Sequence, residues 1–383
     1  YEIAQCLVGS EMCIRDRVVA DPSNGEILGM ASYPTFNLND PRKLTGMYTD
    51  EEIKDMSDEE YRNNLYSLWT NYCVSESYEP GSTFKPVTVA SALEEGVVKD
   101  GDTYVCKGFE TVADYKLKCH VFSTIGSHGS LTVEQALMNS CNPYMIHLAL
   151  EMGNSRFAYY QSLFGFGKIT GIDLPGETTG IVYGDRMTTI DAACNSFGQT
   201  INVNMMQMMA AYCSIINGGM LYQPHIVKRI ESANGEVVKE YKANLVRQTI
   251  TASTSKLLRR YLKNTVEEGT AKKAGVTGYS VAGKTGTAQK GDRKDNKWII
   301  SFIGHAPAEN PKFAIYVVID EPYGTTGTSG SSADVLTLTH NILEKLLPYM
   351  NVYKDASDEY EDTSSSPDEL TVDGIPAGTA SSN

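Results

Sequence analysis

The chain has 383 residues, of which 41% are hydrophobic and 21% charged, and its formal net charge is −14. This length and composition allow a large buried core, in one big domain or two, and the acidic balance argues against nucleic acid as a partner. The longest strongly apolar stretch, residues 205–216, is interrupted by polar side chains and is too short to span a bilayer, so we expect a buried helix there.

Residues 1–17 form a doubtful segment at the beginning of the sequence. Residues 6–17 read CLVGSEMCIRDR and resemble a translated sequencing adaptor, joined to a genuine reading frame that resumes at Val18. In that interpretation Cys6 and Cys13 carry no biological information. The alternative is a real strand that leads into the domain.

The first regular elements are predicted to be a β-hairpin and a helix. Two short apolar runs, residues 18–20 and 26–32, flank the turn sequence DPSNG, which is typical of a hairpin. Residues 51–66 then have the spacing of apolar side chains expected of a helix.

Ser82 and Lys85 lie three residues apart, in a run that reads YEPGSTFK, at the start of a predicted helix. Pro86 in the first turn, apolar residues at helical spacing and Gly96 as the stop all favour this helix. Side chains at i and i+3 lie about 5–6 Å apart on one helix face, so the lysine can act as a base for the serine. The alternative is a capping serine with a lysine that extends to solvent.

Ser140 and Asn142 belong to a second motif, Ser-Cys-Asn. Thr132 and Gln135 form a capping pair that opens a helical stretch over residues 131–152, and Pro143 follows the motif directly. We therefore predict a turn between two helices, because a turn can present both side chains of the motif.

A third motif lies on a predicted strand with small residues, which would let a substrate backbone approach and pair along its edge. Its residues are Lys284, Thr285, Gly286 and Thr287. Two apolar runs, residues 298–305 and 313–320, predict a second hairpin just after it. Further helices are expected at residues 204–216, 255–266 and 333–347.

The order of these elements predicts an α/β (α+β) fold. Strands at both ends of the chain, with a long helical stretch between them, favour one central antiparallel sheet flanked by helices, beside a mostly helical subdomain. The three motifs would then meet where the sheet and the subdomain join.

The three motifs follow one another in the order known from penicillin-binding proteins and related β-lactamases, with 58 residues from Ser82 to Ser140 and 144 from Ser140 to Lys284. Residues 18–350 resemble the transpeptidase domain of class B penicillin-binding proteins, which cross-link peptidoglycan during division, elongation or sporulation. Further segments that carry the likeness are residues 18–34, 171–177, 196–199 and 298–307. The resemblance implies the penicillin-binding transpeptidase and β-lactamase-like fold.

The resemblance also implies a reaction for the first two motifs. Ser82 would attack the penultimate D-alanine carbonyl of a peptidoglycan stem peptide, release the last D-alanine and form an acyl-enzyme, which an amine from a second stem resolves. Lys85 would be the base, Ser140 would relay a proton to the leaving amine, and Asn142 would hold the peptide or Lys85. The same serine would make the protein a target of β-lactams.

The third motif would hold the substrate. Lys284, with Thr285 and Thr287, would bind the terminal carboxylate beside Gly286, and the Lys284 charge would favour the neutral form of Lys85. Backbone N–H groups of Ser82 and Thr287 would form the oxyanion hole. No cofactor or metal is implied. By resemblance, the partner is a membrane-anchored glycan polymerase, and the protein acts at the extracytoplasmic face of the cell membrane.

Three alternatives compete with this interpretation. A β-lactamase of the same fold would need a base for water, and none stands out; a β-lactam sensor domain would use the same acylation. Residues 278–285, GYSVAGKT, also match a phosphate-binding P-loop. A P-loop follows a buried strand and opens a helix, whereas residues 271–277 are not an apolar run and residues 286–297 are polar and contain glycine.

The cysteines leave several possibilities open. Cys106 and Cys119 have a spacing that would suit a disulfide, worth up to about 3 kcal/mol, and sporulation-type members of the family look similar here; two free thiols are the alternative. Cys119 and His120, with His128, suggest zinc, but no paired CxxC spacing supports it. The remaining cysteines are expected to be small buried hydrophobes: Cys73, Cys141, Cys194 and Cys213.

Residues 351–383 form an acidic tail, with eight acidic residues against one lysine. The serine-rich run at residues 364–366 and the lack of apolar periodicity predict a disordered linker.

Overall fold

The computed structural model describes residues 14–44, 48–291, 297–322 and 331–355. Its strands are β1 (Ile14–Ala20), β2 (Ile27–Tyr33), β3 (Thr103–Cys106), β4 (Phe109–Val112), β5 (Tyr115–Lys118), β6 (Gly129–Thr132), β7 (Met220–Tyr222), β8 (Arg229–Glu231), β9 (Val237–Glu240), β10 (Leu245–Gln248), β11 (Ala282–Lys290), β12 (Lys297–Ala306) and β13 (Phe313–Asp320). Its α-helices are α2 (Asp50–Asp55), α3 (Asp58–Trp69), α4 (Tyr72–Ser75), α5 (Lys85–Glu95), α6 (Val133–Met138), α7 (Asn142–Met152), α8 (Asn154–Leu163), α9 (Thr189–Asn195), α10 (Met205–Ile216), α11 (Ala252–Glu267) and α12 (Ala333–Tyr349). Three 3₁₀ turns complete the elements: η1 (Gly81–Phe84), η2 (Gly184–Arg186) and η3 (Lys272–Ala274).

A five-stranded antiparallel sheet joins the two ends of the described chain, in the order β11-β12-β13-β1-β2. Both predicted hairpins are present. The strands β1 and β13 pair with each other although they lie near opposite ends of the chain. The central strands are buried on both faces, and neighbouring residues such as Tyr316 and Val317 belong to different core clusters. This follows from the two-residue period of a strand.

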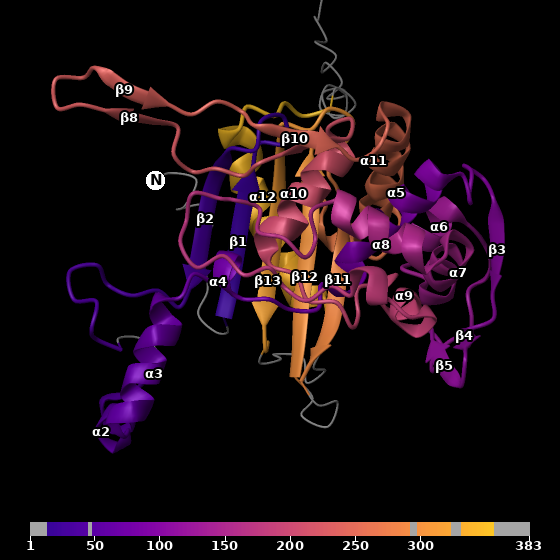
Figure 1. The fold of residues 1–383 in the computed structure, drawn as a ribbon, viewed down its shortest axis with the longest axis horizontal. Helices are drawn as coiled ribbons and strands as arrows, with labels where there is room; N and C mark the ends of the chain where they lie inside the picture. Colours follow the sequence, from indigo (N-terminus) through magenta and orange to yellow (C-terminus); the bar gives the residue numbers. More distant parts are fainter. Residues whose placement is uncertain (1–13, 45–47, 292–296, 323–330, 356–383) are drawn as a thin grey trace, which may run out of the picture.

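Helices cover both faces of the sheet (Figure 1). One face packs against apolar side chains of α12, including Val335 and Leu343, and the other packs against α10 and the helices beyond it. The helical subdomain, α5 to α9, lies beside β11, the edge strand of the sheet (Figure 1). The predicted α+β fold is therefore confirmed, and the junction of sheet and subdomain lies at β11 and η1.

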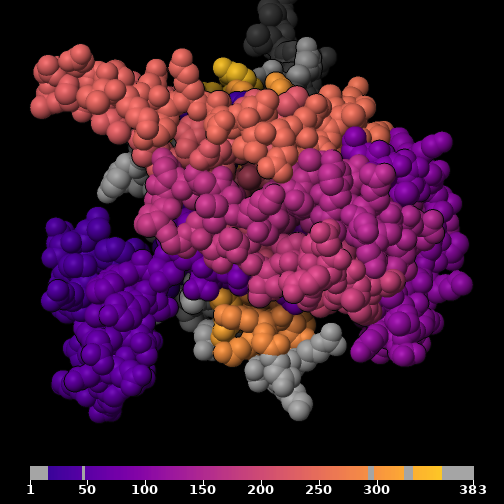
Figure 2. All heavy atoms as spheres, in the orientation of Figure 1, coloured from indigo at the N-terminus to yellow at the C-terminus, as the bar shows by residue number. Residues whose placement is uncertain are grey.

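Two parts of the chain project from the rest of the molecule: the hairpin β8–β9, and the helices α2 and α3 (Figure 2). The prediction of a single helix over residues 51–66 is wrong, because the chain forms two helices there. Ser57 caps the second helix by accepting a hydrogen bond from the Glu60 N–H. Within the described residues, no helix has both the length and the apolar character needed to cross a membrane.

The ends of the predicted domain differ in detail from the structure. Residues 14–17, within the doubtful segment, continue β1, and the rest of that segment lies outside the described residues. At the other end Val352 is buried in the core and the Asp355 N–H donates to Gly278 O, so the packed chain continues beyond the expected boundary at residue 350. Most of the predicted disordered tail, residues 356–383, lies outside the described residues.

Candidate active site

The sequence predicts Ser82 at the start of an α-helix. In the structure Ser82 lies instead in a 3₁₀ turn that precedes the helix. The turn η1 spans Gly81–Phe84, and α5 begins at Lys85, whose backbone N–H donates to Ser82 O. Side chains at i and i+3 eclipse in a 3₁₀ helix, so this geometry aligns Ser82 with Lys85 more closely than an α-helix would. Ser82 is half-buried, whereas Lys85 is completely buried.

Lys85 is hydrogen-bonded to both polar residues of the second motif. Its Nζ donates to Ser140 Oγ at 3.0 Å, to Ser140 O at 2.6 Å and to Asn142 Oδ1 at 2.7 Å. Burial lowers the pKa of Lys85 to about 8. The nearby sulfurs of Cys119 and Cys141 act in the opposite direction and raise this pKa, but by less. These contacts join the first two motifs into one site around a lysine that loses its proton readily.

The second motif forms the predicted turn between two helices. The capping box of Thr132 and Gln135 opens α6, and Cys141 is the N-cap of α7. Between them Ser140 has φ +54°, a left-handed conformation that is uncommon for a residue other than glycine and costs about 1–3 kcal/mol. The Cys141 N–H closes the turn by donating to Ala136 O at 2.8 Å.

The third motif lies on β11, where a substrate strand can be added. Its register with β12 is regular from Lys284 to Thr287, so the chain has no bulge there. Lys284 and Thr285 side chains start on opposite faces of the strand, but Lys284 Nζ still reaches Thr285 Oγ1 at 3.4 Å and Thr285 O at 3.0 Å. Burial, aided by the Lys85 charge, holds the pKa of Lys284 well below its usual range.

Glycines bring η1 and β11 into direct contact. A Cβ atom on Gly286 would lie 2.4 Å from Ser301 Oγ and 2.9 Å from Pro80 O. A Cβ atom on Gly81 would lie 2.5 Å from Thr287 O, and Gly81 also has φ +57°. The glycine of the third motif therefore serves a second purpose that the sequence did not reveal, since it lets η1, which carries Ser82, pack against β11.

Thr270 supports the site and was not predicted. Its Oγ1 donates to Met138 O at 3.3 Å and accepts a hydrogen bond from Thr285 Oγ1 at 3.4 Å. It thereby links the helix before the second motif to the third motif. Nothing in the local sequence marks this residue, because its partners are distant along the chain.

The structure excludes the P-loop interpretation. Residues 278–281 are a connection between η3 and β11, and Lys284 and Thr285 lie inside a strand that continues to Lys290. A phosphate-binding loop instead opens a helix whose N-terminal N–H groups face the phosphate.

The cysteines between the first two motifs are not linked. Cys106 and Cys119 are buried free thiols, so the structure shows the second of the two alternatives that the sequence left open. Cys73, Cys141 and Cys213 are buried as expected, whereas Cys194 is only half-buried.

A known protein family matches most of this chain. The family model described as the penicillin binding protein transpeptidase domain matches residues 17–344. Stage V sporulation protein D of Bacillus subtilis (strain 168) is 39% identical over 341 residues, which are 88% of this chain and 49% of that protein. Peptidoglycan D,D-transpeptidase FtsI of Escherichia coli (strain K12) is 31% identical over 345 residues, again 88% of this chain and 52% of that protein.

Solved structures show the same fold. Penicillin binding protein 3 of Mycobacterium tuberculosis, complexed with aztreonam, matches with a TM-score of 0.76 and 27% identity, over 92% of this chain and 78% of that one. The D,D-transpeptidase domain of a peptidoglycan glycosyltransferase from Eggerthella lenta also has a TM-score of 0.76 and 27% identity, over 92% of this chain and 81% of that one. The chain spans about half the length of the curated relatives. It belongs to the penicillin-binding protein transpeptidase family, among the class B proteins.

Proposed function

We propose that the chain is a serine D,D-transpeptidase domain that cross-links peptidoglycan stem peptides ending in D-Ala-D-Ala, and that β-lactams acylate the same serine. The observation that carries the proposal is the set of hydrogen bonds from buried Lys85 to Ser140 and Asn142, one 3₁₀ turn away from Ser82. This arrangement supplies a nucleophile, its base and a proton relay within one junction.

The acylation step follows from these contacts. Neutral Lys85 takes the proton of Ser82 as its Oγ bonds to the penultimate D-alanine carbonyl carbon. The bond from that carbon to the terminal D-alanine nitrogen then breaks, and the nitrogen takes a proton through Ser140, which lies within hydrogen-bond reach of Lys85. An amine of a second stem attacks the acyl-enzyme by the reverse sequence of proton transfers.

The substrate is held along β11 in this proposal. As the edge strand of the sheet, β11 can pair with the extended stem peptide. Lys284, with Thr285 and Thr287, binds the terminal carboxylate, and the backbone N–H groups of Ser82 and Thr287 receive the oxyanion. The contact between Gly81 and Thr287 supports this last assignment, since it holds the two donor segments together.

Labelling with a fluorescent penicillin tests the nucleophile. The wild type and a control, Ser155→Ala at an exposed position of α8, should be labelled, and Ser82→Ala should not. Persistent labelling of Ser82→Ala would exclude Ser82. Rapid turnover of the penicillin, in place of a long-lived acyl-enzyme, would favour the β-lactamase alternative. Release of D-alanine from a stem peptide that depends on an added acceptor amine would establish transpeptidation.

We further propose that the protein acts at the extracytoplasmic face of the cell membrane, with a membrane-anchored glycan polymerase as partner. The location follows from the proposed substrate, since peptidoglycan is assembled there. Co-purification of the full-length protein with a glycan polymerase from membranes would test the partner.

A further inference from the structure

Four buried hydroxyl groups meet where η1 packs against the central sheet. Tyr78 and Thr83 come from the segment that carries Ser82, whereas Ser301 lies on β12 and Tyr316 on β13. Tyr78 is 4% exposed, and each of the other three is at most 1% exposed. These four residues are the hydroxyl network.

Tyr316 is at the centre of the hydroxyl network. The Tyr78 hydroxyl donates to the Tyr316 hydroxyl at 2.8 Å, although the two residues are 238 positions apart in the chain. The Thr83 hydroxyl donates its one proton to Pro80 O at 2.7 Å. Tyr316 is therefore the donor in its 3.4 Å contact with Thr83 Oγ1. Ser301 also hydrogen-bonds to the Tyr316 hydroxyl.

These contacts hold the backbone immediately before Ser82. Thr83, itself bonded within the hydroxyl network, holds Pro80 O. On the other side of the same peptide group, the Gly81 N–H donates to Gly198 O at 2.9 Å. Both polar atoms of this peptide group are therefore fixed. The next peptide group carries the N–H of Ser82, so its orientation follows from the one that is held.

Packing alone does not require the Tyr316 hydroxyl. A phenylalanine at position 316 would fill the same space in the buried strand β13 without a polar atom, and a buried hydroxyl costs free energy unless it is hydrogen-bonded. A buried network with every member bonded favours one arrangement of the chain, because other arrangements leave polar groups without partners. Burial also raises the pKa of Tyr316, so its hydroxyl keeps the proton that it donates.

We propose that Tyr316 is a positioning residue for the nucleophile: its hydroxyl ties η1 to the central sheet and thereby aims Ser82 at the substrate on β11. This role rests on the proposed function, in which Ser82 supplies both the attacking Oγ and an oxyanion N–H. Tyr316 acts through η1 and not by contact with the substrate. Loss of its hydroxyl should therefore slow the acylation step without weakening the noncovalent binding that precedes it.

Stopped-flow acylation at a series of penicillin concentrations separates these two quantities. Tyr316→Phe should lower the acylation rate constant about 10-fold, since small misplacements of reacting groups reduce rates strongly, and leave the noncovalent dissociation constant unchanged. The matched control is Tyr212→Phe in α10, which removes a similarly buried hydroxyl that is bonded to His305 Nδ1 at 2.8 Å. This control should react like the wild type, whereas a general effect of losing a buried hydrogen bond would slow both variants alike.

A double variant tests whether Tyr78 and Tyr316 act as one unit. Tyr78→Phe removes the donor to Tyr316 and should also slow acylation about 10-fold. Residues that share one hydrogen-bonded network have effects that do not multiply, so Tyr78→Phe/Tyr316→Phe should be about as slow as either single variant. A double variant in which the two losses multiply fully, to about 10²-fold, would contradict the network.

Amide hydrogen exchange provides a readout that needs no penicillin. The Gly81 N–H should exchange faster in Tyr316→Phe than in Tyr212→Phe, because the backbone before Ser82 is released locally. Acylation of Tyr316→Phe at the wild-type rate would overturn the positioning role. A wild type that penicillin does not acylate would contradict the proposed function, while faster Gly81 exchange in Tyr316→Phe would still show that Tyr316 holds η1.

Discussion

Burial of the Lys85 side chain changes its acid–base chemistry. An exposed lysine has a pKa near 10.4 and stays protonated at neutral pH. Lys85 is fully buried, and its three donor contacts end on Ser140 and Asn142. Its ammonium group therefore keeps hydrogen bonds but loses hydration, which favours the neutral base.

The pH dependence of acylation should reveal this base. Because burial lowers the pKa of Lys85 to about 8, its neutral form, which the proposed mechanism requires to accept the Ser82 proton, increases as pH rises through that value. We expect the rate constant for penicillin acylation to rise from about pH 6 and to level off above about pH 9. Acylation rates measured over this range check the prediction, and a flat profile would contradict it.

Substitution of either lysine by arginine should separate the two proposed roles, base for Lys85 and carboxylate binding for Lys284. A guanidinium group stays charged, so Lys85→Arg should reduce the acylation rate at least about 10²-fold, the usual effect of losing a general base. Lys284→Arg keeps a cation for the substrate carboxylate and should be milder. Stopped-flow acylation of both variants measures this difference. If Lys85→Arg reacted as fast as the wild type, the base would have to be another group.

At the scale of elements, the site depends on the contact between η1 and β11. The turn supplies Ser82 and the strand supplies Thr287, and glycines at positions 81 and 286 remove the side chains that would separate them. Catalytic distances between groups on two elements are set by such backbone contacts. Misplacement of reacting groups by about 1 Å can cost about 10²-fold in rate.

Gly286→Ala should therefore impair acylation more than stability. The added methyl group would meet Ser301 Oγ and Pro80 O at less than 3.0 Å and push β11 away from η1. We expect an acylation rate about 10²-fold lower, with secondary structure by circular dichroism unchanged. Gly275→Ala is the matched control, since the nearest atom to its added Cβ is 3.3 Å away. Equal rates for the two variants would show that the contact is not critical.

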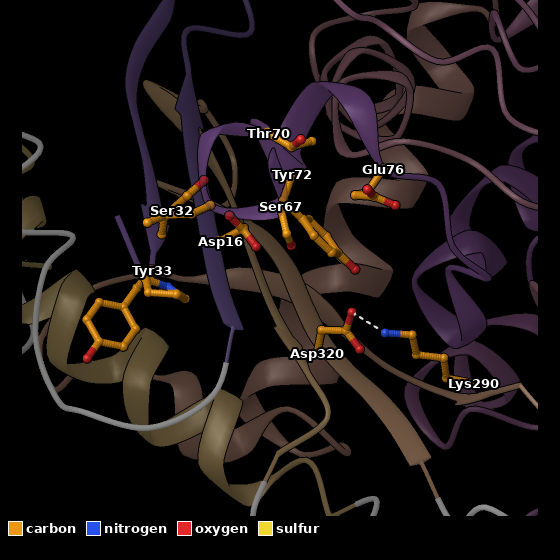
Figure 3. A pocket seen from close by; sticks show the side chains of 11 residues that line it. Asp16, Ser32, Tyr33, Ser67, Thr70, Tyr72, Glu76, Lys290 and Asp320 are labelled. Carbon is orange, nitrogen blue, oxygen red and sulfur yellow. Dashed lines mark hydrogen bonds and ion pairs between the residues drawn. The ribbon is translucent and has the colours of Figure 1, made fainter. Parts of the chain in front are cut away.

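At the scale of the whole molecule, β1 carries an unusual charge into the central sheet. Asp16 is 1% exposed and lines a pocket with Asp320, Tyr72 and Lys290 (Figure 3). Lys290 Nζ is paired with Asp320 Oδ2 at 2.8 Å, while Asp16 Oδ2 has no hydrogen-bond partner among the described residues. Buried polar groups are normally satisfied. The family match begins at residue 17, and residues 14–17 continue β1, so Asp16 lies in the part of the doubtful segment that pairs within the sheet.

Asp16 should make stability depend on pH. Burial raises the pKa of Asp16 to about 7. Between about pH 4 and pH 7 the folded state then binds more protons at this residue than the unfolded state, so its contribution to the free energy of unfolding falls as pH rises and is lost above that window. The raised pKa of Asp16 corresponds to at most about 4 kcal/mol in the free energy of unfolding.

Asp16→Asn should remove this dependence. The variant should match the wild type near pH 4 and exceed its unfolding free energy by up to about 4 kcal/mol near pH 8. Denaturant unfolding at both pH values measures the difference, with Asp114→Asn at an exposed turn as control. A constant difference between Asp16→Asn and the wild type at all pH values would contradict the assigned titration.

The local sequence determined the elements and the chemistry-bearing residues of this protein. Apolar periods of two and 3.6 residues predicted both hairpins and most helices, and the ordered motifs around Ser82, Ser140 and Lys284 identified the site, because these signals depend only on near neighbours in the chain. Tertiary structure decided the rest. The hydrogen bond from Gly81 to Gly198 accompanies the 3₁₀ turn at Ser82, and the contact of Gly286 with η1 sets the distance between the motifs. Cys106, Cys119, His128 and Cys141 come together from four separate segments of the chain. Contacts between distant segments are fixed by packing, and no local pattern records them.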